Sequence, residues 1–457
     1  MNCISYLRKM FSPVLGILIA ASPLQVGAQT KKTADTTQFL TLDQCIVYAM
    51  QHQPAVLQTG IEINIAKKTN AINLSAWLPQ VNLNANLIHY EELPTSFSIN
   101  PQNPEGPLIQ GHPGVINTVI PQISATQVLF SPDVLYAAKS AHLFVQQAQQ
   151  SNDSTKINLI ANVSVTFYNL LLTLEQTNVL KEDTARLAKN LRDTYHQYVG
   201  GIVDKTDYKE AAISLNNSRA QLKQANENIP PQYAVLKQLI GYPPEREFSV
   251  SFDTVQMMKQ IAIDTLQQLQ YEKRIEFQQL QTAKSLQQEN LKYYRSQYLP
   301  TVSAFYNYYY EYESNTSSGL FSQAYPYSYL GASVNIPLFT GFRRQESLQR
   351  AKLQTQLIDL AETNLKSRIY TEYTSALANY KSNLFDLSLL RENQTMARDV
   401  YSVVSLQYKQ GVVAYLNVIT AESNLIASEM SYLNALFQVL QSKVNLEKAM
   451  GNTSIKR

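Results

Sequence analysis

Residues 198–203 read Tyr-Val-Gly-Gly-Ile-Val, and residues 408–413 read Tyr-Lys-Gln-Gly-Val-Val. The two segments lie 210 residues apart, and Gly241 and Gly451 repeat the same spacing. Self-similarity at a fixed offset is the sequence signature of a repeated structural unit. We therefore expect a first repeat over 29–240, a connector over 241–263 and a second repeat over 264–457. The repeated glycine segments are expected to sit at equivalent places in the two units.

Long heptad patterns flank both glycine segments. Residues 132–198 and 342–408 contain no internal Pro or Gly, since Pro132 stands at the first position only, and each predicts one helix of roughly 100 Å at 1.5 Å per residue. Large and small residues alternate at core positions, which indicates closely packed coiled-coil helices, and the glycine segments become their hairpin tips. Pro230-Pro231 has no counterpart in the second unit and predicts a break or kink. The residues spaced by seven are Leu215, Leu222, Ile229 and Leu236 in one unit and Leu425, Tyr432, Val439 and Leu446 in the other.

Between the helices the period changes from 3.5 to 2. Alternation of apolar with small or polar residues predicts four strands, at about 80–93, 118–130, 301–312 and 327–339. The first strand is the clearest case, because Val, Leu, Ala and Leu alternate with asparagines over residues 81–87. Each unit is therefore expected to run helix, strand, loop, strand, helix, tip, helix. The fold class is α+β, with two strands in each repeat.

Composition excludes several classes of function. The net charge is +3 with no basic run, which argues against a nucleic-acid partner. Cys3 and Cys45 are the only cysteines, so neither a disulfide framework nor a four-cysteine zinc site can form. The five histidines show no paired ligand spacing, and no nucleotide-binding glycine pattern or catalytic triad stands out. We expect no enzyme, no cofactor and no metal site.

The N-terminal segment predicts the compartment. Residues 1–28 read as a secretory signal, with Arg8 and Lys9 before an apolar stretch and small residues before the expected cut. No sufficiently long uncharged apolar run follows, so no transmembrane helix is expected. Two classes remain open. One is a soluble periplasmic coiled-coil scaffold, and the other is an outer-membrane β-barrel, whose strands escape hydropathy plots.

Backbone chemistry decides what four strands can do in lipid. An open sheet edge in hydrocarbon leaves unsatisfied N–H and C=O groups, so closure requires several chains. Three copies would give a twelve-stranded barrel with its amide face toward water and its apolar face toward lipid, continued by a coiled-coil tunnel. Trp77 and Tyr298 stand just before the Leu-Pro entries of two strands and are candidates for an interfacial aromatic belt. A scaffold needs no such lipid-facing stripe.

The order of these motifs resembles the TolC family of outer-membrane efflux proteins. The resemblance covers about residues 40–451. It implies a homotrimer in the cell outer membrane with a periplasmic extension, and passive export of substrates. These would be handed over by a periplasmic adaptor (membrane fusion) protein and an inner-membrane transporter. Drug efflux and type I protein secretion use the same channel architecture, and the sequence does not identify the transported substrate. The matching motifs are Leu42-Asp43-Gln44, Trp77-Leu78-Pro79, Leu129-Phe130, the 198–201 tip, Tyr298-Leu299-Pro300, the 337–341 strand exit and the 408–411 tip.

The resemblance also places candidate site residues. Family members carry pore-facing acids six and nine residues after the tip glycine. Those positions hold Asp207 and Glu210 in the first repeat but Asn417 and Thr420 in the second, so a ring of acids would come from the first repeat alone. The alternative is that the two acids only stabilise the first turn of a helix. By the same resemblance, the tip backbones form the adaptor-docking surface. The tip glycines are Gly200, Gly201 and Gly411.

Overall fold

The structure is a computed structural model that describes residues 38–99, 101–251, 261–264 and 267–452. The expected signal segment 1–28 lies outside the described residues. Apart from Gln38, the elements described below belong to one compact unit, which begins at Phe39.

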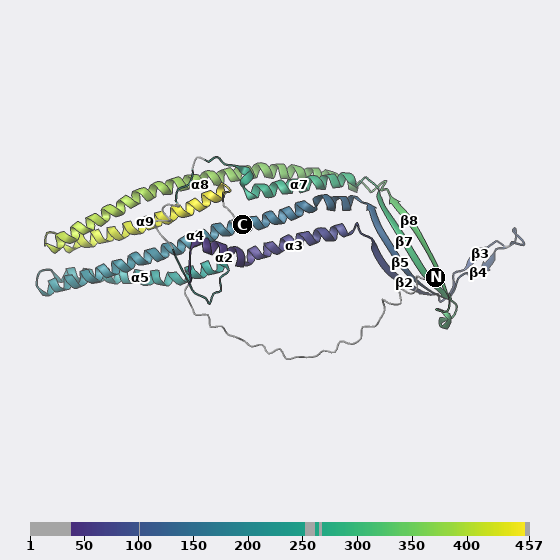
Figure 1. Ribbon diagram of the computed structural model, residues 1–457, viewed down its shortest axis with the longest axis horizontal. Helices are drawn as coiled ribbons and strands as arrows, with labels where there is room; N and C mark the ends of the chain where they lie inside the picture. The colour runs from purple at the N-terminus through teal and green to yellow at the C-terminus, as the bar shows by residue number, and fades with distance from the viewer. Residues whose placement is uncertain (1–37, 100, 252–260, 265–266, 453–457) are drawn as a thin grey trace, which may run out of the picture. The chain divides into compact units, whose positions relative to one another are not determined.

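Two long helical hairpins dominate this unit. Helix α4, Pro132–Val199, turns into α5, Lys205–Ile240, and α8, Arg343–Lys409, turns into α9, Tyr415–Ala449. The partners of each hairpin lie side by side (Figure 1), and α4 also packs against α9. The uninterrupted helices predicted between the strands and the tips are confirmed, because no residue within them removes a backbone donor or favours a left-handed conformation.

Three shorter helices belong to the helical layer of the described residues. They are α2, Leu42–His52, α3, Pro54–Ser75, and α7, Ile275–Ser296. Helices α3 and α7 both pack against α4, and α7 also packs against α8. The minor elements are β1 (Gln38–Leu40), β3 (Ser96–Ser98), β4 (Ile109–Gly111), β6 (Phe248–Val250), η1 (Tyr271–Lys273) and η2 (Ser317–Gly319).

The expected break at the proline pair is absent. Helix α5 continues through Pro230 and Pro231 to its end at Ile240. Each proline removes one helical hydrogen bond, to the carbonyl four residues earlier. Those carbonyls belong to Asn226 and Glu227, which are exposed, so water can replace the lost donors.

The four long strands form one antiparallel sheet in the order β2-β5-β7-β8. Strand β2 spans Gln80–His89, β5 spans Asn117–Phe130, β7 spans Thr301–Ser314 and β8 spans Ala324–Asn335. The pairing β5–β7 joins strands that are almost 200 residues apart in sequence. The strands of the two expected repeats therefore meet in the middle of a single sheet.

Three strand boundaries differ from the expected ones by three residues or more. The first strand ends at His89 rather than at 93, before a bend that precedes Pro94. The last strand runs from Ala324 to Asn335 rather than over 327–339. Pro337 has no N–H to donate to a ladder, which explains the early end. Pro326 is tolerated inside β8 because β8 is an edge strand of the sheet within this chain.

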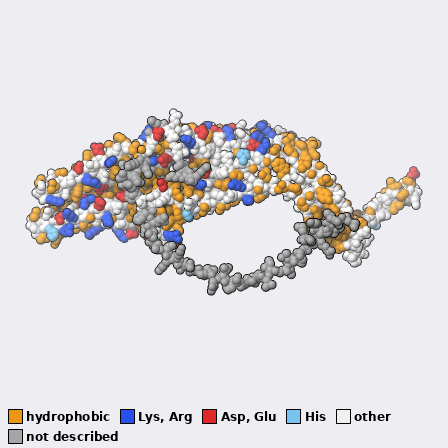
Figure 2. All heavy atoms as spheres, viewed as in Figure 1, with side chains coloured by type: hydrophobic (Ala, Val, Ile, Leu, Met, Phe, Trp, Pro, Cys, Tyr) orange, Lys and Arg blue, Asp and Glu red, His pale blue; other side chains and the backbone are white. Residues whose placement is uncertain are grey.

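Side-chain types are distributed unevenly over the unit. In the view of Figure 2, hydrophobic side chains gather over the four strands, whereas Lys, Arg, Asp and Glu lie mainly over the helices. The strands themselves contain only two acidic residues and no Lys or Arg. An apolar band next to a charged helical region is the distribution that a membrane-embedded sheet with an aqueous extension requires.

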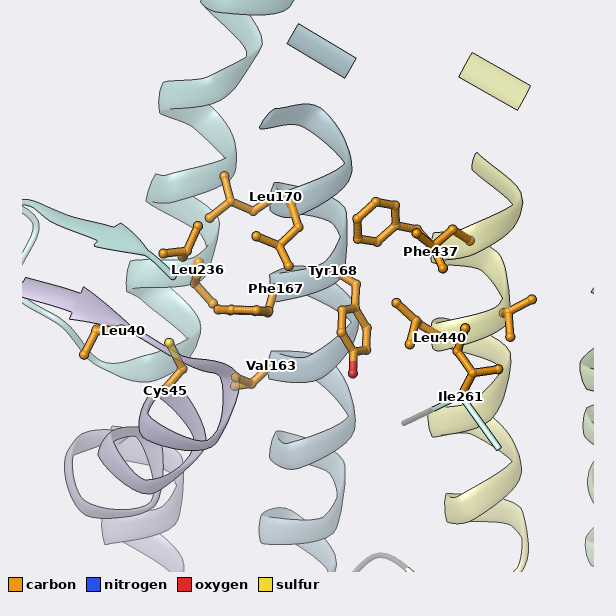
Figure 3. Packing of buried hydrophobic residues seen from close by; sticks show 14 of the residues in the cluster. Leu40, Cys45, Val163, Phe167, Tyr168, Leu170, Leu236, Ile261, Phe437 and Leu440 are labelled. Atoms are coloured by element: carbon orange, nitrogen blue, oxygen red, sulfur yellow. The ribbon is translucent and has the colours of Figure 1, made fainter. Parts of the chain in front are cut away.

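The largest hydrophobic core lies where α2, α4, α5 and α9 meet. Phe167 of α4 points toward Leu236 of α5 on one side, and Tyr168 points toward Leu440 of α9 on the other (Figure 3). Cys45 is fully buried in this cluster, which confirms it as a small core residue. Burial raises the pKa of its thiol to about 12, so the sulfur stays protonated and packs as an apolar group.

Helix α4 is the one helix among the described residues that is long and apolar enough to cross a membrane, judged by length and composition alone. No such helix was expected from the sequence. The uncharged stretch 157–174 of α4 mixes Leu, Ile, Val and Phe with Asn, Ser and Thr. Its apolar members, among them Val163, Phe167 and Leu171, are buried in the core. Core helices pass the same length and composition test, so this finding reflects the packing of α4.

Candidate functional site

The sheet has one amide-rich face and one apolar face. Asn84 pairs in register with Gln122, and Ser124 with Asn307, so amides and hydroxyls share one side. Gln122 Nε2 donates to Asn307 Oδ1 at 3.0 Å, which ties the two halves of this face together. On the opposite side, Leu83 stands beside Ile123, and Leu83 is 72% exposed. An exposed apolar face on an otherwise polar sheet indicates contact with lipid or protein.

Strands β2 and β8 are the free edges of the sheet in this chain. Leu87 on β2 and Leu330 on β8 are among its most exposed large apolar residues, at 69% and 78%. Neither edge carries a charged side chain that would blunt it against pairing with another strand. The edges are therefore suited to pairing with further strands.

The aromatic belt candidates lie where helix gives way to strand. Trp77 follows α3 and Tyr298 follows α7, and their side chains are 43% and 48% exposed. The guanidinium of Arg344 lies 4.7 Å from the centre of the Tyr298 ring, and its Nη2 donates to the Leu338 carbonyl at 3.2 Å. A half-exposed aromatic beside a cation suits the polar boundary of a membrane.

The two helical tips share one backbone geometry. The Ile202 amide donates to the Gln197 carbonyl and the Val412 amide to the Gln407 carbonyl, both at 2.9 Å. This is the six-to-one bond of a Schellman turn. Gly201 and Gly411 occupy its left-handed position, with φ of 70° and 76°. Gly200 closes α4 with φ of −76°, so it is not required for the turn geometry.

The four pore-lining candidates are placed differently by the structure. Asp207 and Glu210 are half-buried in the first turns of α5, whereas Asn417 and Thr420 are exposed on α9. The hydroxyl of Thr420 donates to the Leu416 carbonyl of its own helix at 2.9 Å. The contacts described within one chain do not join these four residues into a ring, and their role stays a prediction.

One of these acids acts across the hairpins. Burial raises the pKa of Tyr408 on α8, and the carboxylates of Asp207 and Asp193 add to the effect. The Tyr408 hydroxyl donates to Gln197 Oε1 of α4 at 2.8 Å. This contact joins the two tips by a polar link.

A buried carboxylate pair between α4 and α9 escaped the sequence analysis. Asp183 and Glu422 are only 1% and 2% exposed. Arg186 Nη2 donates to Asp183 at 3.3 Å, and its Nε lies 3.6 Å from Glu422 Oε1. Asn190 Nδ2 donates to Glu422 at 3.2 Å, and Ser218 Oγ of α5 donates to Asp183 at 2.7 Å. One guanidinium thus serves two buried acids.

The electrostatics of this pair follow from its burial. Burial raises the pKa of Glu422 to about 7, and the nearby Asp183 raises it further, while Arg186 and Asn190 oppose the rise. Burial also raises the pKa of Asp183, against the Ser218 and Arg186 contacts. A polar cavity of about 360 Å³ adjoins both acids. The signal was available in the sequence, because Glu422 lies on the stripe of buried Val418 and Leu425.

The described residues contain no group of three or more His, Cys, Asp or Glu side chains arranged to hold a metal ion. The geometry offers a two-faced sheet, free strand edges and long paired helices. These features suit a wall that separates lipid from water.

Comparisons with known proteins agree with this architecture. The model of the outer membrane efflux protein family matches residues 45–242 and 266–452. The antibiotic efflux pump outer membrane protein ArpC of Pseudomonas putida is 21% identical over 423 residues, covering 88% of this chain and 83% of the relative. The outer membrane protein TolC of Vibrio cholerae is 19% identical over 444 residues, covering 94% and 95%.

A solved structure extends the agreement to the fold. The CmeC outer membrane channel of Campylobacter jejuni superposes with a TM-score of 0.71 at 16% sequence identity, covering 98% of this chain and 96% of that one. The family model spans both hairpins and all four long strands. The chain belongs to the outer membrane efflux protein family, and its place is the outer membrane.

Proposed function

We propose that three copies of this chain form the outer-membrane duct of a tripartite export system. Each copy contributes four strands to a twelve-stranded barrel, and the helical hairpins continue the duct into the periplasm. An inner-membrane transporter supplies the energy and a periplasmic adaptor bridges it to the tips, so the duct itself is passive and catalyses no reaction. The repeats 29–240 and 264–457, joined by the connector 241–263, supply equivalent halves of each protomer.

The free edges of the two-faced sheet carry this proposal. In hydrocarbon, unpaired backbone groups cost several kcal/mol each, so β2 and β8 need partners. The order β2-β5-β7-β8 alternates in direction, so β8 of one copy can pair antiparallel with β2 of the next. Closure in this way places every amide-rich face inside and every apolar face in lipid.

The helices carry a second argument for association. Leu353, Leu357 and Leu360 on α8 are 60–67% exposed and repeat at helical spacing. Ile61 and Ile65 on α3 form a similar exposed stripe, at 59% and 57%. Apolar stripes of this kind on an aqueous helix are coiled-coil seams that await a partner. We assign them to contacts between neighbouring copies.

The site residues take their roles from this assembly. Trp77 and Tyr298 mark the periplasmic boundary of the membrane, and the tips around Gly201 and Gly411 contact the adaptor. Asp207 and Glu210, with Asn417 and Thr420, line the constriction at the tip end. Only the first-repeat positions are acidic, so the constriction carries at most six carboxylates in a trimer.

Small molecules are the favoured cargo. The Pseudomonas putida relative is named for an antibiotic efflux pump, which favours efflux over protein secretion. Pull-down of the adaptor and transporter from native membranes separates the two, because the transporter sets the substrate. A soluble scaffold would instead be released from membranes by high salt without detergent.

Two measurements test the duct. Purified protein in a planar bilayer is expected to give discrete conductance steps, and folded protein that leaves the bilayer silent contradicts the proposal. Strand closure is tested by cysteines at Asn84 on β2 and Ser333 on β8, with Cys45 replaced by Ser. The double variant is expected to form disulfide-linked oligomers, whereas each single variant does not. If the double variant also forms no disulfide-linked oligomers, the pairing of these edges is contradicted.

A further inference from the structure

The amide-rich face of the sheet changes character from β2 to β8. In register, Asn84 stands beside Gln122, Gln122 beside Tyr309, and Tyr309 beside Tyr327. A single row across the sheet therefore passes from two amides to two tyrosines. Tyr329, two residues along β8, lies on the same face. Contact with water does not by itself call for tyrosine at these positions, because β2 carries amide side chains on the same face.

The three rings form an ordered stack. The ring centres of Tyr309 and Tyr327 are 4.6 Å apart with planes 9° from parallel, and those of Tyr309 and Tyr329 are 5.8 Å apart at 21°. The hydroxyl oxygens of Tyr309 and Tyr329 are 3.1 Å apart and hydrogen-bonded. Phe305 meets Tyr329 edge-on at 6.1 Å and supports it from β7. We call Tyr309, Tyr327 and Tyr329 the tyrosine stack.

The stack is open on its outer side. The side chains of Tyr327 and Tyr329 are 45% and 47% exposed, while Tyr309 is half-buried between them. Aromatic rings associate by offset stacking at separations of about 4.5–7 Å. A flat ring can therefore extend the stack without moving the strands.

The charged residues near the tyrosine stack favour a cationic ligand. Glu311 and Glu313 are the only Asp, Glu, Lys or Arg residues in the four long strands. Both lie an even number of residues from Tyr309 and so share the face of the stack, and Glu311 pairs in register with Tyr325. Ring faces and a carboxylate both attract cations, and no Lys or Arg of these strands opposes them.

We propose that the tyrosine stack together with Glu311 binds flat organic cations at the water-lined face of the barrel. The inference rests on the proposed function in one respect, that this face lines the duct. It goes beyond that function by naming a site and a solute class. Stacking selects the flat ring, and the carboxylate with the ring faces selects the positive charge.

Binding of ethidium, a flat aromatic cation, to the purified protein in nonionic detergent micelles tests this proposal by fluorescence. Tyr327→Ser is expected to weaken ethidium binding about tenfold, the effect of losing one desolvated cation–aromatic contact. Tyr327→Phe keeps the ring and is expected to retain binding. Tyr310→Ser is the matched control, since it removes a tyrosine from the other face of β7 and is expected to change nothing.

Two competitors separate the two parts of the site. Caffeine is flat and uncharged, and tetramethylammonium is charged without a ring. Each is therefore expected to displace ethidium less well than a competitor that is both flat and positively charged. Glu311→Gln is expected to weaken ethidium binding and to leave the competition by caffeine unchanged.

Equal loss of ethidium binding in Tyr327→Ser and Tyr310→Ser, or equal displacement by all cations regardless of shape, would overturn the site. The binding measurement needs no conduction. A silent bilayer with intact, Tyr327-dependent ethidium binding therefore contradicts the duct alone, and a conducting protein without that binding contradicts this site alone.

Discussion

Glu422 is a charged residue at a core position, and its cost depends on pH. The pKa of about 7 in the folded protein lies above the value of 4.5 for a free glutamate, so the folded state holds the proton more tightly. Stability from this group is therefore greatest at acid pH and is lost as pH rises from about 4.5 through 7. The shift corresponds to roughly 3 kcal/mol.

Glu422→Gln removes the ionisable group while keeping an acceptor for Asn190. Arg186 retains Asp183 as its partner, so no guanidinium is orphaned. At pH 8 the variant is expected to have a free energy of unfolding about 1–3 kcal/mol above that of the wild type, and therefore a higher unfolding temperature. At pH 5 the two are expected to be similar. Loss of helical circular dichroism on heating measures both.

Glu429→Gln is the matched control for this pH dependence. Glu429 lies one heptad farther along α9, is 7% exposed and has its own partner, since Arg398 Nη2 donates to it at 2.9 Å. Because Glu422 and its contacts are unchanged in this control, it is expected to keep the difference in stability between pH 5 and pH 8. A Glu422→Gln variant that also keeps this difference would show that another group titrates.

Gly241 combines a left-handed backbone with close contact. Its φ is +71°, and a Cβ there would meet the His52 carbonyl oxygen at 2.7 Å. Gly241→Ala is expected to cost roughly 2–4 kcal/mol, from backbone strain plus displacement of the end of α2. Gly411→Ala has a similar φ of +76° but open space, so it is expected to cost only about 1–2 kcal/mol. Equal shifts in thermal midpoint would contradict the role of the contact.

At the scale of elements, the periodicity of the sequence predicted the helices and strands, because their backbone geometry sets the spacing of buried side chains. The four strands and the two long hairpins follow from periods of 2 and 3.5, and the tip turns follow from Gly201 and Gly411. The strand end before Pro337 was equally open to prediction, because proline cannot donate to a ladder. Which strands pair, and which acid faces another helix, depend on contacts across about 200 residues and left only weak local signals.

At the proline pair of α5, the predicted break is absent. Pro230 and Pro231 lie on an exposed part of a helix that packs along α4, and this packing holds the helix together without two of its bonds. Replacing both by Ala restores those bonds and is expected to stabilise α5 by about 1–3 kcal/mol. Slower amide hydrogen exchange over residues 222–234 would report the gain. Unchanged exchange would mean that the backbone there already forms alternative bonds.

At the scale of the whole molecule, the two faces of one strand are expected to tolerate charge very differently. Leu83 and Asn84 are neighbours on β2, and Leu83 projects from the apolar face. Leu83→Lys places an ammonium in hydrocarbon, at a cost of about 2–4 kcal/mol for each chain if the residue lies near the membrane midplane. Three chains multiply this cost, so loss of membrane-inserted oligomer is expected.

Asn84→Lys adds the same charge one residue away, toward water. Assembly is expected to be kept, because an ammonium in an aqueous lumen remains solvated. Single-channel recordings are expected to show reduced cation preference instead, since three positive charges would line the pore. Semi-native gels of membrane extracts report assembly for both variants. If Asn84→Lys abolished the oligomer as Leu83→Lys is expected to do, the amide-rich face would not face water. That result would contradict the proposed orientation of the sheet in the barrel.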